Sequence, residues 1–98
     1  VGAGMGSTLN ITAAKNGYTL SDRGTWISFK NRRELVLLVG GGPSLINPYG
    51  MILVDPLKHP HIKAKEGLQF ILWMTSQEGK NAIDTYRVND QQLFRSTP

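Results

Sequence analysis

The sequence has no cysteine among its 98 residues, which excludes a disulfide framework and a cysteine-based zinc site. It also has no long hydrophobic run. The longest uninterrupted apolar stretch, Leu35 to Val39, is five residues, whereas a membrane-spanning helix needs about 20. Charged residues make up 18% and apolar residues 40%, unlike the charge-rich, apolar-poor composition of disordered tails. A chain of this length and composition is expected to form one compact domain.

Acidic residues are scarce and scattered, 7 against 11 lysines and arginines, and no serine lies in a pattern that pairs it with a histidine base. The sequence therefore predicts a protein that is not an enzyme. Both histidines occur in His59-Pro60-His61, where Asp55 would complete a ligand set only if the loop folded back. We expect a surface loop here, with no metal ion and no catalytic cofactor.

The net charge of +4 raises nucleic acid as an alternative partner. A nucleic-acid groove would need exposed aromatic side chains between the basic residues. Six of the 11 lysines and arginines cluster in two groups, which are Lys30, Arg32 and Arg33, and Lys58, Lys63 and Lys65. The aromatic residues lie instead on the apolar faces of expected helices and are predicted to be core, namely Trp26, Phe29, Phe70 and Trp73. A small basic nucleic-acid-binding module is therefore the less favoured alternative.

The apolar pattern predicts an α/β fold in the order helix, strand, helix, strand, strand, helix, helix. The first helix is expected to carry Leu9, Thr12 and Ala13 on one side. Ser7 or Thr8 is its expected N-cap, and Asn16-Gly17 its end, with Gly17 in the left-handed conformation. Strands are expected over 18–20, 35–39 and 46–54, and the second is expected to be covered on both faces because it lacks polar alternation.

The remaining helices are predicted from helical spacing. The second helix is expected to include positions 26 to 30. A third begins near Lys63, and Ser76 is expected to end it and to cap the next one. The inward residues of that last helix are expected to be Ala82, Ile83 and Tyr86, and Leu93 and Phe94 are expected to dock as a tail.

The most informative segment is Tyr18-Thr19-Leu20-Ser21-Asp22-Arg23-Gly24-Thr25, which combines hydroxyls, a guanidinium and a glycine at a predicted strand-to-helix junction. The first N–H groups of a helix lack intrahelical partners, and the helix dipole is positive there. These features are typical of an oxyanion site made of N–H and O–H dipoles and one positive charge. The alternative is that Ser21 or Asp22 caps the helix and that Arg23 points into solvent.

A second glycine-rich helix start is Gly4-Met5-Gly6-Ser7-Thr8. It is not a nucleotide-binding motif, because the spacing of G-x-G-x-x-G and the phosphate-loop lysine are both absent. Gly6, Ser7 and Thr8 are a secondary candidate that could add donors to the anion site.

Six short motifs cover nearly the whole chain in a fixed order. They are Gly-Met-Gly-Ser-Thr-Leu-Asn (4–10), Tyr-Thr-Leu-Ser-Asp-Arg-Gly-Thr (18–25), Asn-Pro-Tyr-Gly (47–50), Lys-His-Pro-His (58–61), Thr-Ser-Gln-Glu-Gly (75–79) and Gln-Gln-Leu-Phe (91–94). In this order and spacing they resemble the C-terminal half of the tungstate-binding proteins, which are the extracytoplasmic solute-binding components of tungstate ABC importers.

This resemblance implies a two-lobed, type II periplasmic-binding-protein fold with three-layer α/β/α lobes, incomplete in this chain. Residues 1–44 would be the end of the second, inserted lobe, 45–54 the hinge strand that crosses back, and 55–98 the C-terminal helices of the first lobe. It also implies a periplasmic or extracellular location, with a membrane tether as an option for the full-length parent. The partner would be an ABC transporter permease.

The resemblance further implies that the anion contacts come from Asp22, Arg23, Gly24 and Thr25, flanked by Thr19 and Ser21. The ligand would be tungstate or molybdate, with a phosphate or sulfate receptor as the alternative. The stretches Thr-Thr-Thr-Ser and Ser-Arg-Gly-Asp of the family's N-terminal half do not occur here, so this chain alone is expected to bind weakly or not at all. The 98 residues are expected to be a processed or truncated piece. It is expected to form a homo-oligomer by pairing of strand edges or by exchange of the crossing segment near Pro48, or else to exist as a proteolytic product.

Overall fold

The computed structural model describes all of residues 1–98 and divides them into two compact units. Unit 1 comprises Val1–Asn47 and Arg87–Leu93, and unit 2 comprises Pro48–Tyr86 and Phe94–Pro98.

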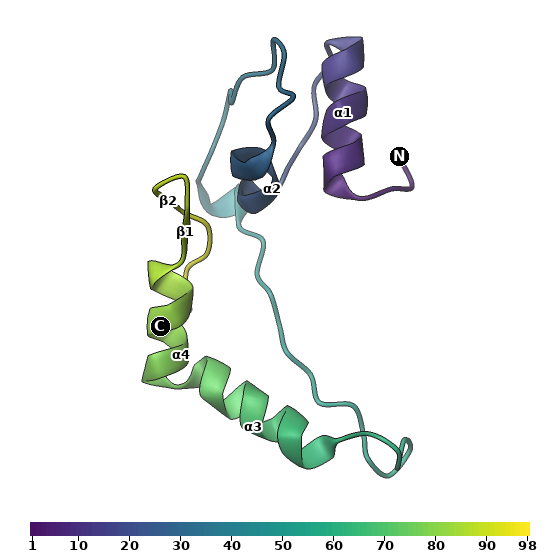
Figure 1. The fold of residues 1–98 in the computed structure, drawn as a ribbon, viewed down its shortest axis with the longest axis vertical. Coiled ribbons are helices and arrows are strands. Elements are labelled where there is room, and N and C mark those ends of the chain that lie inside the picture. The colour runs from purple at the N-terminus through teal and green to yellow at the C-terminus, as the bar shows by residue number, and fades with distance from the viewer. The chain divides into compact units, whose positions relative to one another are not determined.

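The chain forms four α-helices, a short 3-10 helix and a two-stranded sheet (Figure 1). In order they are α1 (Met5–Lys15), α2 (Arg23–Ser28), η1 (Pro43–Leu45), α3 (Ala64–Thr75), α4 (Gln77–Thr85), β1 (Arg87–Val88) and β2 (Gln91–Gln92). This mixture of helices and a small sheet fits the predicted α/β class. None of the helices is both long enough and apolar enough to span a bilayer.

Helix α1 begins after Gly4, which has no side chain to cap it, so the expected N-cap at Ser7 or Thr8 is wrong. Both residues lie within the first turn, and the Thr8 hydroxyl donates back to the Gly4 carbonyl at 3.1 Å. The left-handed conformation expected of Gly17 is adopted by Asn16, with φ of 50°. Asparagine tolerates this region better than other side chains do, and the helix consequently ends one residue earlier.

The core of unit 1 is formed by α1 and α2. Leu9, Ala13 and Ile27 are buried, and Thr12 is buried beside them with its hydroxyl donating to the Thr8 carbonyl at 2.8 Å. Leu9, Thr12 and Ala13 recur at helical spacing and therefore share one face of α1, as the sequence predicted.

Helix α2 is shorter than expected, because it ends at Ser28 and leaves Phe29 and Lys30 outside. Arg32 satisfies carbonyls at this end. Its Nη2 donates to the Trp26 carbonyl at 2.6 Å, and its Nε donates to the Phe29 carbonyl at 3.0 Å. The guanidinium carbon lies 4.1 Å from the centre of the Trp26 ring, a cation–π contact. Arg32 thus stabilises α2, which accounts for its charge without a nucleic-acid partner.

The hairpin β1–β2 is an element that the sequence reasoning missed. Its strands are antiparallel, with Arg87 opposite Gln92 and Val88 opposite Gln91. The two connecting residues, Asn89 and Asp90, have φ of 51° and 61°. Two left-handed residues make the type of turn whose twist matches a two-residue hairpin, and asparagine and aspartate are among the few residues that adopt it. The pair Asn89-Asp90 was therefore the feature of the sequence from which the hairpin could have been predicted.

The strands expected over 18–20, 35–39 and 46–54 are absent, and none of these segments belongs to a sheet. The predicted cover on both faces of 35–39 is also wrong, since the side chains of Val36 to Val39 are 62% to 73% exposed. A strand requires a neighbour that hydrogen-bonds to its backbone, and no other segment of these 98 residues pairs with it. An apolar run indicates what a strand would bury, but it does not supply the neighbour.

Unit 2 is built on α3 and α4, which meet at Ser76 as predicted. The Ser76 hydroxyl accepts from the Gly79 N–H at 3.2 Å and so caps α4. Gly79 is buried at this corner, because the first turn of α4 lies directly against the end of α3. A Cβ at position 79 would collide with the Trp73 carbonyl oxygen and would lie 2.8 Å from the Cα and carbonyl oxygen of Met74.

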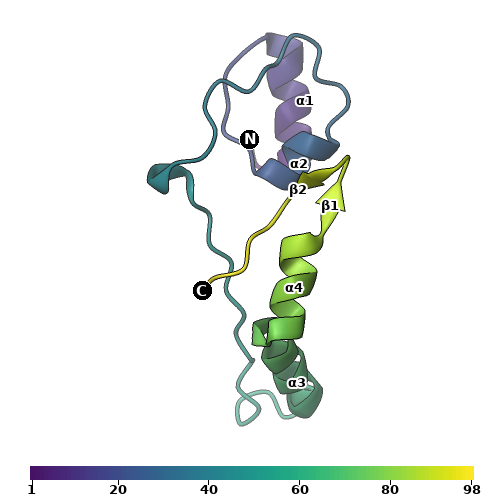
Figure 2. The same cartoon turned by 90° about the vertical axis from the view of Figure 1, so that its left-hand side faces the viewer.

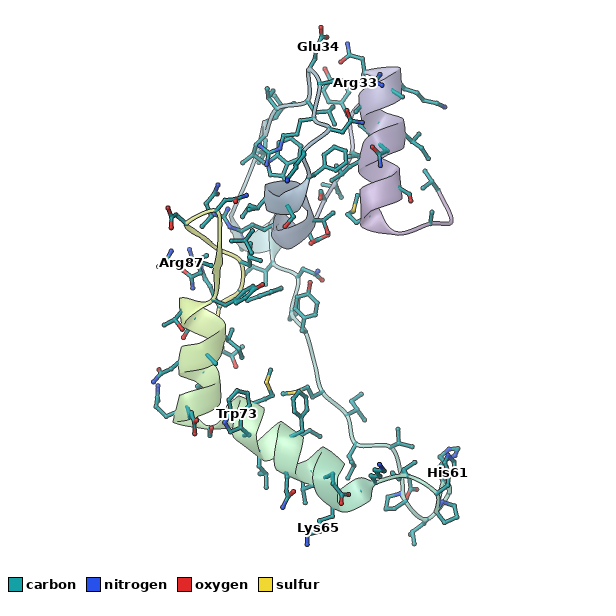
Figure 3. All side chains as sticks on the ribbon, viewed as in Figure 1. Arg33, Glu34, His61, Lys65, Trp73 and Arg87 are labelled. Carbon is teal, nitrogen blue, oxygen red and sulfur yellow. The ribbon has the colours of Figure 1, made fainter.

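The apolar stripe of α3 is largely exposed, so the prediction that Phe70 and Trp73 are core is wrong; their side chains are 58% and 41% exposed. Figure 3 shows Trp73 on α3. Along α4 and just after it, Ile83 is half-buried, whereas Ala82 and Tyr86 are exposed, contrary to expectation. The reason is the same as for the missing strands. Helical spacing selects the apolar face correctly, but unit 2 contains no layer that covers it.

The C-terminal tail of unit 2 is held through Phe94 and Ser96. The Phe94 ring packs edge-on against the Tyr49 ring, with centroids 6.0 Å apart. The Asp84 carboxylate accepts from the Ser96 N–H and from the Ser96 hydroxyl, both at 2.7 Å. Part of the expected docking of Leu93 and Phe94 is therefore seen, since Leu93 is half-buried and Phe94 contacts a ring.

The tie between Asp84 and Ser96 is expected to depend on pH. The backbone hydrogen bond from Ser96, followed by the hydroxyl hydrogen bond, lowers the pKa of Asp84 below its ordinary value of 3.8. Because the pKa of Asp84 is lowered in the folded protein, its hydrogen bonds with Ser96 stabilise the fold fully at pH values above the ordinary pKa. This stabilisation is lost as the pH falls through the lowered pKa. We therefore expect the Ser96 amide resonance in the NMR spectrum to shift only in strongly acidic solution, and Asp84→Asn to remove that transition. A transition of the Ser96 resonance centred at or above the ordinary pKa of 3.8 would contradict this.

Candidate functional site

The segment 18–25 leads into α2, and Asp22 is its N-cap. The Oδ2 atom of Asp22 accepts from both the N–H and the hydroxyl of Thr25, each at 2.9 Å, and its carbonyl accepts from the Trp26 N–H at 3.2 Å. The capping alternative that the sequence left open is thus what the structure shows for Asp22. The carboxylate is turned toward the backbone of α2, where it neutralises part of the positive end of this six-residue helix.

The hydroxyls of this segment donate to local acceptors. Ser21 donates to the Asp22 carbonyl at 2.9 Å, and Thr19 donates to the Leu20 carbonyl at 3.1 Å. Both side chains are exposed, and Thr25 is half-buried with its hydroxyl on Asp22. Hydroxyl hydrogens rotate at little cost, so an exposed serine or threonine can transfer its donor to an anion that approaches.

Arg23 is exposed, as expected if it points into solvent, but its side chain also makes a hydrogen bond to the protein. Its Nε donates to the main-chain carbonyl of Gln92 at 2.9 Å, a contact between residues 69 positions apart in the chain. The guanidinium therefore has one donor fixed on the hairpin, and its terminal amino groups make no hydrogen bond to the protein. Gly24 follows directly and is half-buried.

The secondary candidates lie in the first turn of α1. Gly6 and Thr8 are half-buried and Ser7 is exposed. Helix α1 starts at the lower end of unit 1 in Figure 1, and residues 16–22 return to that end before α2 begins, as the turned view in Figure 2 also shows. The structure therefore brings the first turns of α1 and α2 to the same end of unit 1.

The role of Asp22 as a cap can be tested by substitution in the intact protein. Asp22→Ala leaves the Thr25 N–H without a side-chain acceptor and is expected to lower the free energy of unfolding by about 1 kcal/mol, whereas Asp22→Ser retains an acceptor and most of the stability. Chemical denaturation measures both. Equal losses for the two variants would show that the side chain at position 22 does not cap α2.

Other candidate sites give no comparable arrangement. The rings of His59 and His61 meet edge-on with centroids 6.1 Å apart, in the loop before α3 where Figure 3 labels His61. No group of three or more His, Cys, Asp or Glu residues is placed to hold a metal ion. The residues that sequence reasoning missed at the anion candidate are those of the hairpin, above all Gln92, because a backbone carbonyl leaves no signal in the side-chain pattern.

Comparisons with known proteins found relatives that are named as anion-binding or tungstate-binding proteins. The chain is 38% identical over 96% of its length to a protein of Haloferax volcanii named as a candidate ABC transporter anion-binding protein, and it covers 29% of that protein. It is 35% identical over 87% of its length to the tungstate-binding protein TupA of Peptoclostridium acidaminophilum, of which it covers 30%. It is 33% identical over 95% of its length to the tungstate-binding protein TupA of Campylobacter jejuni, of which it covers 36%.

The chain thus spans about a third of the length of these relatives, all of which are named as binding proteins. No solved structure matches it. The PBP superfamily domain matches residues 1–78, which include the first turns of α1 and α2 and the segment around Arg23. With four fifths of its residues within that match, the chain belongs to the PBP superfamily.

Proposed function

We propose that this chain is part of the solute-binding component of an ABC importer that captures tungstate or molybdate and delivers it to a membrane permease. The observation that carries the proposal is the 33–35% identity to two tungstate-binding proteins over 87–95% of the chain. A binding role in such a system would place the protein outside the cytoplasm. Because the chain covers only about a third of those relatives, the proposal concerns the whole protein in which these residues occur.

The proposed anion contacts in this chain are the Arg23 guanidinium, the backbone at Gly24, and the hydroxyls of Thr19, Ser21 and Thr25. Support comes from the fixed Nε of Arg23 and from the exposure of Arg23, Thr19 and Ser21. Asp22 would act by holding the start of α2 through Thr25 rather than by touching the ligand. Gly6, Ser7 and Thr8 would add donors from α1, whose first turn lies at the same end of unit 1.

The engagement of Asp22 favours tungstate or molybdate over phosphate. Both metal oxyanions are dianions without a proton near neutral pH, so they need donors only. Hydrogen phosphate carries a proton and is best held where a free carboxylate accepts it. The Oδ2 atom of Asp22 already accepts two hydrogen bonds from Thr25, so part of the local acceptor capacity for such a proton is used at the start of the helix.

We also propose that these residues form part of a two-lobed binding protein: 1–44 the end of one lobe, 45–54 the crossing hinge, and 55–98 the closing helices of the other lobe. The apolar side chains of Val36 to Val39, exposed here, are what a strand inside a three-layer lobe would bury. The same exposed segment would lead the isolated chain to self-associate. Sedimentation of the isolated chain as a monomer at high micromolar concentration would contradict that last point.

The experiment that tests the proposed function is calorimetric titration of the intact protein with tungstate, molybdate, sulfate and phosphate. We expect tungstate or molybdate to bind with submicromolar affinity, tighter than about −8 kcal/mol, and sulfate and phosphate to bind far more weakly. Tight binding of phosphate or sulfate alone would replace the proposal with its alternative. Binding to DNA that weakens steeply with salt, without any anion binding, would favour the nucleic-acid alternative.

A further inference from the structure

We propose that the hairpin β1–β2 is a positioning element for Arg23, holding the guanidinium so that its two terminal amino groups are left for an oxyanion. The inference rests on the proposed function, which assigns Arg23 to the anion site. It adds a role for residues 87–92, which form no part of the site as the sequence predicted it.

The contact that carries the inference is the hydrogen bond from Arg23 Nε to the Gln92 carbonyl oxygen. Its length of 2.9 Å is that of a well-formed N–H···O bond. A guanidinium offers five N–H donors in one plane, and an oxyanion is bound by two of them in parallel. Those two come either from Nε and one terminal nitrogen, or from both terminal nitrogens. Because the Nε–H already donates to the Gln92 carbonyl, only the two terminal nitrogens remain for the anion. Arg23 would therefore bind the anion end-on, through these two nitrogens.

The hairpin is held in place along α2 by more than this contact. The Asn89 side-chain amide lies 3.5 Å from the Ile27 carbonyl, near the opposite end of α2 from Arg23. The register pairs Arg87 with Gln92 and is fixed by the two-residue turn. Figure 2 shows the hairpin next to α2. A change of the turn that altered the register would therefore move the Gln92 carbonyl relative to Arg23.

The turn offers a matched pair of variants at Asp90, which has φ of 61°. Glycine adopts this conformation without strain, whereas valine is a genuine outlier there because its Cβ is branched. Asp90→Gly and Asp90→Val remove the same carboxylate, so any difference between them comes from the backbone of the turn. Neither substitution touches Arg23 or the segment 18–25.

The test is calorimetric titration of the intact protein with tungstate. We expect Asp90→Val to weaken tungstate binding about tenfold (about 1.4 kcal/mol) and Asp90→Gly to change it by less than about twofold. In an Arg23→Ala background, Asp90→Val should cause no further loss, because the hairpin then has no guanidinium to position. Equal affinities for the two Asp90 variants, or a full loss from Asp90→Val in the Arg23→Ala background, would overturn the positioning role.

A second measurement does not depend on ligand and separates this inference from the proposed function. The Arg23 Nε–H signal in a ¹⁵N NMR spectrum, identified by its loss in Arg23→Lys, is expected to be protected from exchange in the native protein and in Asp90→Gly, and unprotected in Asp90→Val. An unprotected signal in the native protein overturns the positioning role even if tungstate binds. A protected signal in a protein that binds no oxyanion overturns the proposed function, and with it the use of the fixed guanidinium for an anion.

Discussion

Gly79→Ala is expected to destabilise the intact protein by about 3 kcal/mol, at the upper end of what overpacking costs. The added Cβ would collide with the Trp73 carbonyl oxygen and approach the backbone of Met74 to 2.8 Å. Backbone atoms of a helix end cannot rotate away as a flexible side chain can, so α3 and α4 would have to separate at Ser76. That movement would also disturb the cap from the Ser76 hydroxyl to the Gly79 N–H.

The matched control for this substitution is Gly67→Ala in α3. There the added Cβ would meet only the Cδ1 atom of Leu53, at 2.8 Å, which is the end of a side chain that can move. Alanine is also the better helix former by about 1 kcal/mol, so Gly67→Ala is expected to be neutral or stabilising. Thermal unfolding of both variants measures the difference. A Gly79→Ala protein as stable as Gly67→Ala would show that α3 and α4 do not meet as closely as described.

Arg23→Ala is expected to weaken tungstate or molybdate binding by the intact protein at least tenfold, about 1.4 kcal/mol. The substitution removes the only positive charge of the segment 18–25. That charge is not neutralised by a carboxylate, because Arg23 donates to the neutral carbonyl of Gln92. Because Arg23 is exposed, the melting temperature of the ligand-free protein should change little. Calorimetric titration measures the affinity, and an unchanged value would remove Arg23 from the site.

Two further variants separate the charge of Arg23 from its geometry. Lys30→Ala removes an exposed positive charge from the same unit, so it reports any long-range electrostatic contribution and is expected to change affinity by less than about twofold. Arg23→Lys keeps the charge but loses the planar fork of donors and the Nε–H that Gln92 accepts. A loss in Arg23→Lys close to that in Arg23→Ala would show that geometry matters more than charge at this position.

Much of the candidate site followed from residue types alone. A cap by Ser21 or Asp22 was one of the two alternatives that the sequence offered at the start of α2, and the structure shows Asp22 accepting from the Thr25 N–H. The cap at Ser76 was predicted for the same reason. Such local features could be predicted because a cap depends on a side chain and a backbone group only three residues away. The partner of Arg23 could not, because it is a backbone carbonyl 69 residues further along the chain.

The sequence by itself determined which segments are helical, which faces of those helices are apolar, and to which superfamily the chain belongs. Only the tertiary structure decided that the Gln92 carbonyl holds Arg23 and that positions 35–39 form no strand. It also decided that Arg32 donates to a carbonyl of α2 and lies over the Trp26 ring. The physical reason is the range of the interactions. A helix satisfies its backbone within four residues, so its pattern is complete in the local sequence. A strand or a long-range hydrogen bond needs a partner that no local pattern can supply.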